Sequence, residues 1–241
     1  MLGSLFSGEG IDILIEIVCR LAAVIIALSL HEFAHAYVAH KCGDDTAKIN
    51  GRMTVNPLKH IDPLGFIMLI LLRFGFAKPV PINPYNFKKM RRDYFLVAIA
   101  GVTVNLVLAF ISSFFFVIVT VYGNFNQNFT FIIWYFFLSL MAINIGLMIF
   151  NLIPIFPLDG FRVVESAAGR NNKFVSFMRK YGQYILIGLL IWSFLIDFIS
   201  GVVTPEAANV LRYFNILDLL LGTLRGWIVD GFTGFWRLIF N

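Results

Sequence analysis

The sequence predicts an all-α polytopic membrane protein with about four to five transmembrane helices and a re-entrant, strand-containing loop at residues 46–87. Three observations predict this fold class. The chain is 59% hydrophobic and only 14% charged, with a mean hydropathy of +0.82. It contains several apolar runs of about 20 residues, the length that crosses a hydrocarbon layer of roughly 30 Å. Its connecting segments carry most of the lysines and arginines, as cytoplasmic loops do.

The apolar runs place the spans along the chain. They lie near residues 17–40, 93–122, 129–153 and 184–203, with room for a fifth after residue 207. The final stretch mixes charged residues with aromatic ones, which predicts a short fifth span followed by an amphipathic surface helix. We expect one membrane domain over residues 1–241, with its functional core at about 11–165 and the C-terminal span and surface helix at about 181–241.

Loop charges predict the orientation of these spans. Basic residues gather in 41–92 and again in 162–180, so both loops are expected on the cytoplasmic side. The connector 122–129 is uncharged and is expected outside, together with the N-terminus. Residues 1–10 lack the basic region of a signal peptide, and we expect the first span to remain as an anchor. The net charge of +5 comes from these loops and does not predict a nucleic-acid partner.

The loop at 46–87 contains the apolar piece "FIMLILL" at 66–72, which is too short to span and predicts a re-entrant segment. On either side lie "GRMTVNP" (51–57) and "GFAKPVPINPYNF" (75–87), whose alternation and turn residues predict short strands. Strand backbone near a bilayer needs a hydrogen-bonding partner, and an extended peptide is one such partner.

The first apolar run contains the sequence "HEFAH" at residues 31–35. Ionisable residues inside a span are costly and indicate a functional site. His31 and His35 are four positions apart, so a helix places both imidazoles on one face, where they can bind the same zinc ion. Glu32 follows the first histidine, as the general base does in metalloproteases with an H-E-x-x-H motif. The cysteines Cys19 and Cys42 lie about 35 Å apart on such a helix and cannot pair.

A catalytic zinc usually has three protein ligands, so the motif needs a third. A metzincin would have Gly at position 38 and His at 41, whereas this chain has Val38 and Lys41. His40 lies about 140° around the helix from His35 and cannot join its face. The remaining acidic candidates are Asp159, Glu165, Asp197 and Asp218.

Depth in the membrane favours Asp159. His31 and His35 lie about 9 to 15 Å from the cytoplasmic end of the first span, if that end is near Lys41. The third span ends on the same side in "NLIPIFPLDG", where two prolines interrupt the helix and Gly160 permits a tight turn. The chain can therefore bend back and bring Asp159 to the metal.

The remaining polar candidates are asparagines in the predicted spans and a His-x-Asp sequence in the loop. Asn105 lies near the depth of His31; it either donates a hydrogen bond to the oxyanion of a tetrahedral intermediate or bridges packed helices, a contact worth about 0.6 kcal/mol. Asn144 and Asn151 are expected to be helix-packing or turn residues, with Asn151 a further candidate for supporting the metal ligands. His60 and Asp62 precede a proline and are expected to form a turn.

Five segments, in this order, resemble the site-2 protease family of intramembrane zinc metalloproteases, and most of all its short bacterial branch without a PDZ or CBS domain. They are "HEFAHAYVAH", "GRMTVNPLKHIDPLG", "FAKPVPINPYNF", "AGVTVNL" and "NLIPIFPLDG", and the likeness covers about residues 15–165. The resemblance implies that His31, His35 and Asp159 bind one Zn²⁺ per chain and that Glu32 is the general base. Gly101 and Asn105 match a G-P-x-x-N segment of the family, in which Val102 here replaces the proline.

The expected function is therefore hydrolysis of a peptide bond in or near the transmembrane segment of a membrane-anchored protein, with Glu32 and Asn105 as catalytic residues. The expected partners are a single-span membrane protein or peptide and the lipid bilayer. An alternative from another class is a metal transporter or an inactive scaffold that uses the same three ligands only to hold a cation. A purely structural membrane protein would leave the acids inside the membrane unexplained. The sequence leaves the oligomeric state open.

Overall fold

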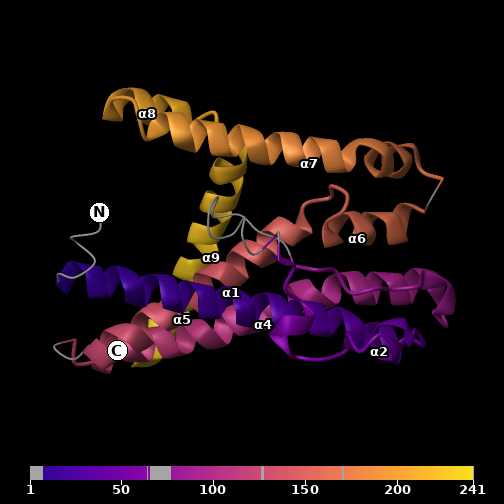
Figure 1. Ribbon diagram of the computed structural model, residues 1–241, viewed down its shortest axis with the longest axis horizontal. Helices are drawn as coiled ribbons and strands as arrows, with labels where there is room; N and C mark the ends of the chain where they lie inside the picture. Colours follow the sequence, from indigo (N-terminus) through magenta and orange to yellow (C-terminus); the bar gives the residue numbers. More distant parts are fainter. Residues whose placement is uncertain (1–7, 64, 66–76, 126–127, 170, 241) are drawn as a thin grey trace.

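The computed structural model describes residues 8–63, 65, 77–125, 128–169 and 171–240 (Figure 1). The regular elements within these ranges are all helical, which confirms the predicted all-α class. The long helices are α1 (Gly8–Lys41), α4 (Met90–Tyr122), α5 (Asn128–Leu152), α7 (Lys173–Ser200) and α9 (Ile216–Phe240). The short ones are α2 (Thr46–Ile49), α6 (Asp159–Ala168) and α8 (Pro205–Arg212).

Within the described ranges, four helices are long and apolar enough to cross a membrane. They cover Asp12–Lys41, Met90–Tyr122, Phe129–Leu152 and Lys173–Ser200, close to the four predicted spans. The largest difference is in α7, which begins 11 residues before the predicted residue 184. The side chain of Asn172 accepts a hydrogen bond from the backbone N–H of Phe174 at 2.9 Å, so this helix begins at an Asn cap rather than at its apolar run.

Helices α1, α4 and α5 pack together as a bundle, and α7 and α8 lie apart from this bundle (Figure 1). A core cluster lies between α4 and α5 and consists of Val102, Ala109, Met141, Ile145, Met148 and Ile149. Helix α4 runs unbroken through Val102, the position at which the related family has proline. Cys19 and Cys42 are both free, as the sequence predicts.

The C-terminal region differs from the predicted order of a short span followed by a surface helix. The short helix α8 comes first, and α9 then continues without a break over residues 216–240. Leu221, Ile228, Val229 and Phe232 of α9 pack against the cluster between α4 and α5. Trp236 packs on Phe110 with ring centroids 4.8 Å apart and ring planes tilted by 40°, and its indole N–H donates a hydrogen bond to Ser113 Oγ at 2.9 Å. The apolar and aromatic side chains of α9 thus pack against the bundle, where the sequence predicts a surface helix.

The predicted strands in residues 46–87 are absent from the described part of this loop. Its pairing there is a single antiparallel bridge between Ile61 and Ala77. Two Asn-Pro pairs form short 3₁₀ helices instead, Pro57–Lys59 and Pro84–Asn86, in which Asn56 and Asn83 cap the first turn. Local turn chemistry thus prevails over the alternating pattern, because proline lacks the N–H that a strand requires. The predicted re-entrant piece at 66–72 lies outside the described residues.

The second half of the loop is fastened to the end of α1 by Asp44, which is fully buried. Its carboxylate accepts hydrogen bonds from Thr46, from the backbone N–H of Asn83 at 2.7 Å and from the side chain of Asn86 at 2.8 Å. Burial opposes ionisation, but these hydrogen bonds outweigh it and lower the pKa of Asp44 below its usual range. The segment between Ala77 and Asn83 is thereby held along α1.

Candidate metal centre

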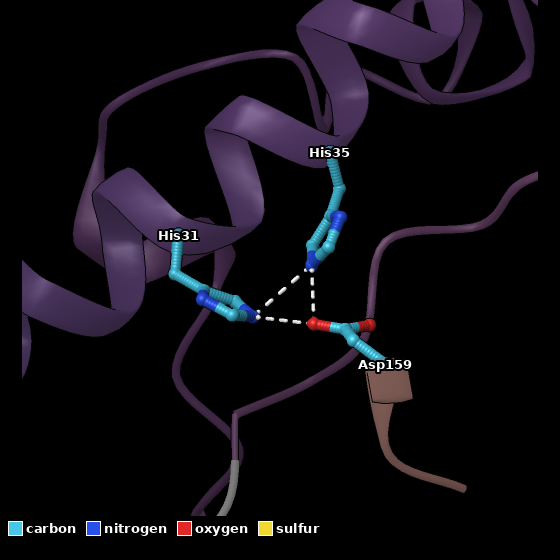
Figure 2. Close-up of side chains that lie close together, drawn as sticks. All are labelled: His31, His35 and Asp159. Carbon is cyan, nitrogen blue, oxygen red and sulfur yellow. Dashed lines mark hydrogen bonds and ion pairs between the residues drawn. The ribbon is translucent and has the colours of Figure 1, made fainter. Parts of the chain in front are cut away.

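His31, His35 and Asp159 meet at one point inside the bundle (Figure 2). Nε2 of His31 lies 3.0 Å from Nε2 of His35, and Oδ2 of Asp159 lies 3.2 Å from the first of these nitrogens and 3.0 Å from the second. All three residues are buried, with exposed fractions of 5%, 3% and 5%. Among the described residues this is the one group of three His, Cys, Asp or Glu side chains that can hold a metal ion.

Helix α1 supplies the two histidines from successive turns of one face, as the four-residue spacing predicts. Asp159 is the first residue of α6, which the chain reaches after turning back from the end of α5. Gly160 makes this turn possible, because a Cβ atom there would lie 2.3 Å from the backbone oxygen of Leu152. The prolines and the glycine of "NLIPIFPLDG" therefore act together to return the carboxylate to α1.

Helix α4 supports the histidines from behind. The backbone oxygen of Val97 lies 2.7 Å from Nδ1 of His35. Gly101 leaves room for both rings, since a Cβ atom would lie 2.4 Å from Cε1 of His31 and 2.6 Å from Nε2 of His35. Asn105, which is fully buried, places its Nδ2 atom 3.2 Å from Nδ1 of His31. The sequence predicted neither the contact of the Val97 carbonyl with His35 nor the close approach of Gly101 to the two rings.

The donor set fits a metal ion such as zinc. A carbonyl oxygen only accepts, so Nδ1 of His35 carries a proton, and Nε2 of the neutral ring presents a lone pair toward Asp159 Oδ2 and His31 Nε2. Lone pairs this close require a positive charge between them, supplied either by a proton or by a metal ion. Two imidazole nitrogens and a carboxylate oxygen, each backed by a further hydrogen bond or ion pair, are the ligands typical of a catalytic zinc site.

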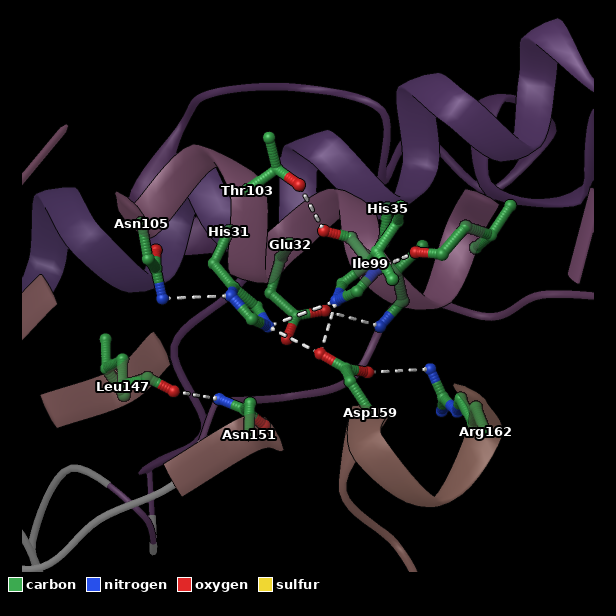
Figure 3. A network of polar contacts seen from close by, with 12 residues as sticks. His31, Glu32, His35, Ile99, Thr103, Asn105, Leu147, Asn151, Asp159 and Arg162 are labelled. Carbon is green, nitrogen blue, oxygen red and sulfur yellow. Dashed lines mark hydrogen bonds and ion pairs between the residues drawn. The ribbon is translucent and has the colours of Figure 1, made fainter. Parts of the chain in front are cut away.

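Arg162 lies one turn beyond Asp159 on α6, and its Nη1 atom is 3.4 Å from Oδ1 of that carboxylate (Figure 3). This contact is not among the sequence predictions, although the i, i+3 spacing of the two residues signals it. The positive charge of Arg162 next to this carboxylate favours its anionic form, which is the form that binds a metal ion.

Glu32 is half-buried and points toward the loop segment that Asp44 fastens to α1. Its Oε2 atom accepts a hydrogen bond from the backbone N–H of Val80 at 2.9 Å (Figure 3). Val80 is itself buried and packs with Ala36 and Ala47. This contact joins residues 48 positions apart in the chain, and no local pattern in the sequence predicts it.

The other polar candidates lie elsewhere. His40 pairs with Asp45 at the end of α1. His60 Nε2 lies 2.7 Å from the backbone oxygen of Thr54, and Asp62 accepts from the N–H of Gly65, so both belong to turns as predicted. Asn144 and Asn151 donate to backbone oxygens of their own helix. Glu165 pairs with Arg179, while Asp197 bonds Asn215, whose side chain also accepts from the N–H of Asp218.

Comparisons with known proteins agree with this geometry. Residues 117–193 match peptidase family M50. The chain is 47% identical over 143 residues to "Putative zinc metalloprotease YwhC" of Bacillus subtilis (strain 168), covering 59% of this chain and 65% of that protein. It is 29% identical over 151 residues to "Putative zinc metalloprotease Rip2" of Mycobacterium tuberculosis (strain H37Rv), covering 60% and 55%. No solved structure shows a significant match.

The chain is also 28% identical over 176 residues to "Putative zinc metalloprotease Rip2" of Mycolicibacterium smegmatis, covering 71% of this chain and 66% of that protein. The chain thus spans about 55 to 66% of the length of these relatives. The matched residues 117–193 contain Asp159 and the turn that positions it, while the two histidines contribute from α1. Over residues 117–193 the chain is thus similar to peptidase family M50, the family of the site-2 proteases, and over about three fifths of its length it is similar to a protein named as a zinc metalloprotease.

Proposed function

We propose that this protein is a zinc metalloendopeptidase that hydrolyses a peptide bond in or near the transmembrane segment of membrane-anchored proteins. The observation that carries the proposal is the convergence of His31, His35 and Asp159 on one buried point, with Glu32 next to the first ligand on the same helix. The match of residues 117–193 to peptidase family M50 and the metalloprotease names of the relatives support it.

In the proposed reaction Nε2 of each histidine and Oδ2 of Asp159 would hold one Zn²⁺ ion. When bound, the ion supplies Lewis acidity, which lowers the pKa of water and polarises a carbonyl group. The chain itself supplies the proton transfers. The carboxylate of Glu32 takes a proton from the attacking water and returns it to the leaving amine.

Val80 prepares Glu32 for this role. Its N–H holds Oε2, whereas no described residue bonds Oε1, so one oxygen orients the carboxylate and the other is left for the proton. A fixed carboxylate loses less conformational freedom in the transition state than a mobile one. The half-buried position of Glu32 also suits a group that must meet water inside an apolar span.

The substrate we propose is a single-span membrane protein or peptide, in line with regulated intramembrane proteolysis. The metal site lies on α1 within a predicted span, toward the end at Lys41, and basic residues of the loop 41–92 favour the cytoplasmic side for that end. We therefore propose an active site near the cytoplasmic face and an N-terminus outside. A transmembrane helix hides its carbonyls in internal hydrogen bonds, so the substrate must unwind before cleavage.

The described loop offers little pairing capacity to an unwound substrate at residues 78–81. Pro79 and Pro81 have no N–H. The N–H of Lys78 donates to the backbone oxygen of His60 at 2.8 Å, and the N–H of Val80 donates to Glu32. A substrate that adds to this segment by β-pairing must therefore use its carbonyl oxygens or displace these bonds.

The alternative of a cation transporter requires several ligand groups along a path across the membrane. The described residues contain one group, and Glu32 has no task in transport. Zinc-dependent cation flux in proteoliposomes without proteolysis would support the alternative.

The test uses the full chain purified in detergent, with zinc measured by elemental analysis and cleavage measured on a panel of single-span peptides. We expect one zinc per chain, and we expect Glu32→Gln to retain zinc while cleavage falls by about 100-fold or more. Glu16→Gln, a change on the same helix at a partly exposed position, is the matched control and should cleave normally. Full cleavage by Glu32→Gln, or a wild-type protein that binds no zinc, would contradict the proposal.

A further inference from the structure

Helix α4 presents positions 97, 101 and 105 to the two histidines, and their four-residue spacing puts them on one face. The backbone oxygen of Val97 contacts His35, and Gly101 leaves space for both rings because it has no side chain. Asn105 offers its amide to His31. Each histidine thus has its Nδ1 atom in contact with α4 and its Nε2 atom in the cluster.

Val97 and Asn105 differ in how they constrain the position of the proton on the two imidazole rings. The oxygen of Val97 is an acceptor only, so it fixes the proton of His35 on Nδ1 and leaves Nε2 free for a metal. Nδ1 of His31 has Asn105 as its partner among the described residues, and an amide can donate or accept. The tautomer of His31 is therefore decided by the orientation of Asn105.

Neither role expected for Asn105 accounts for its surroundings. Its amide lies on the far side of the His31 ring from Asp159, which does not suit a donor to the oxyanion (Figure 3). Its Oδ1 atom is buried and has no hydrogen-bond partner among the described residues, which does not suit a satisfied link between helices. Among the described residues, the hydrogen-bond partner of its side chain is His31.

We propose that Asn105 is a positioning residue that selects the metal-binding tautomer of His31. With Nε2 bound to a metal, neutral His31 carries its proton on Nδ1 and needs an acceptor there. A half-turn of the amide exchanges Oδ1 and Nδ2, and Oδ1 then accepts from Nδ1–H. Partners of this kind orient metal ligands and affect metal affinity by about 10- to 100-fold. The inference rests on the proposed function, because it takes His31 as a zinc ligand.

The experiment measures zinc affinity of the purified full chain by competition with a chromophoric chelator, without a cleavage assay. Asn105→Leu removes the acceptor at nearly constant volume and should weaken zinc binding by about 10- to 100-fold. Asn105→Asp keeps an acceptor and should recover most of this loss. Asn144→Leu is the matched control, since Asn144 is equally buried but bonds only the backbone of its own helix, and its affinity should be unchanged.

Visible absorption of the cobalt-substituted proteins provides a second signal, and it should change in Asn105→Leu but not in Asn144→Leu. If Asn105→Leu binds zinc like the wild type, the inference is wrong, whatever happens to cleavage. A wild type without zinc would instead refute the proposed function. If Asn105→Leu does not fold, the NMR signal of the His31 Nδ1 proton in the zinc-loaded wild type decides: a shift typical of a hydrogen bond to an acceptor supports the inference, and an Nδ1 proton without a hydrogen bond overturns it.

Discussion

Gly101 lies so close to His31 that a Cβ atom on the glycine would be 2.4 Å from Cε1 of the imidazole. The same added atom would lie 2.6 Å from Nε2 of His35. Two helices that approach this closely can share one polar site, because the backbone of α4 comes within hydrogen-bonding reach of a ring on α1. The glycine thus serves the metal centre directly.

Gly101→Ala is therefore expected to displace both imidazoles. Overpacking of this kind costs about 1 to 3 kcal/mol, and here the atoms that must move are the metal ligands. We expect zinc affinity to fall by at least about tenfold, in keeping with what ligand-orienting contacts contribute. Gly146→Ala on α5 is the matched control, since a Cβ atom there meets nothing within 4 Å. Equal zinc affinities in the two variants would contradict the expectation.

Gly160→Ala tests the turn that carries Asp159. The added Cβ atom would lie 2.3 Å from the oxygen and 2.5 Å from the carbon of the Leu152 carbonyl group, and backbone atoms cannot rotate away as a side chain can. We expect loss of zinc together with a lower melting temperature. Gly188→Ala, at an open position in α7, should change neither. Zinc content and thermal melts on the same preparations measure both effects.

Removal of the metal should lower stability. Without an ion, the lone pairs of His31, His35 and Asp159 face one another at 3.0 to 3.2 Å. A ligand that binds only the folded state adds about 2.7 kcal/mol at 100 times its Kd. A chelator should therefore lower the melting temperature of the wild type and of Glu32→Gln by several degrees. The same treatment of Asp159→Ala should produce a much smaller shift; an equal shift would place the metal elsewhere.

Substitution of Asp44 should disturb the loop and substrate cleavage more than substitution of its neighbour Asp45. Asp44→Ala leaves several donors without their acceptor, a loss of about 1 to 3 kcal/mol, whereas Asp45 is half-exposed. We expect faster proteolysis of the loop at residues 77–89 and weaker cleavage of substrate, because Val80 no longer holds Glu32. Zinc content should stay the same, and Asp45→Ala should resemble the wild type.

The lowered pKa of Asp44 also gives this contribution a pH dependence. A carboxyl whose pKa is depressed in the folded state adds stability above its ordinary pKa of 3.8, and loses it as the pH falls through the folded value. Melting temperatures of wild type and Asp44→Asn should therefore converge at pH values below that range. A difference that persists there would show that the charge of Asp44 is not what fastens the loop.

The metal cluster was within reach of sequence reasoning because each part has a local signal. The histidine spacing is set by the helical repeat, and the prolines and Gly160 before α6 mark a turn at matching depth. Val80 and Val97 had no such signal, since their backbone groups act through the path of the chain rather than through side-chain type. The loop was predicted as strand because its alternation was given more weight than its two Asn-Pro turns. The segment that forms α9 was predicted as a short span followed by a surface helix because its charged residues resemble an interfacial pattern. In the structure it is one helix, and its aromatic residues pack on α4.

His35 and Asp159 are separated by 124 positions, and almost the whole of two further hydrophobic helices lies between them. During synthesis the ribosome must release the third span and the turn after it before the carboxylate can reach its partners. A nascent chain with only its first two spans inserted therefore holds a pair of histidines and no anionic ligand. Under the proposed function such a precursor would bind zinc weakly and would not cleave neighbouring polypeptides, so the order of the three ligands along the chain would delay the onset of cleavage until the third span has been made.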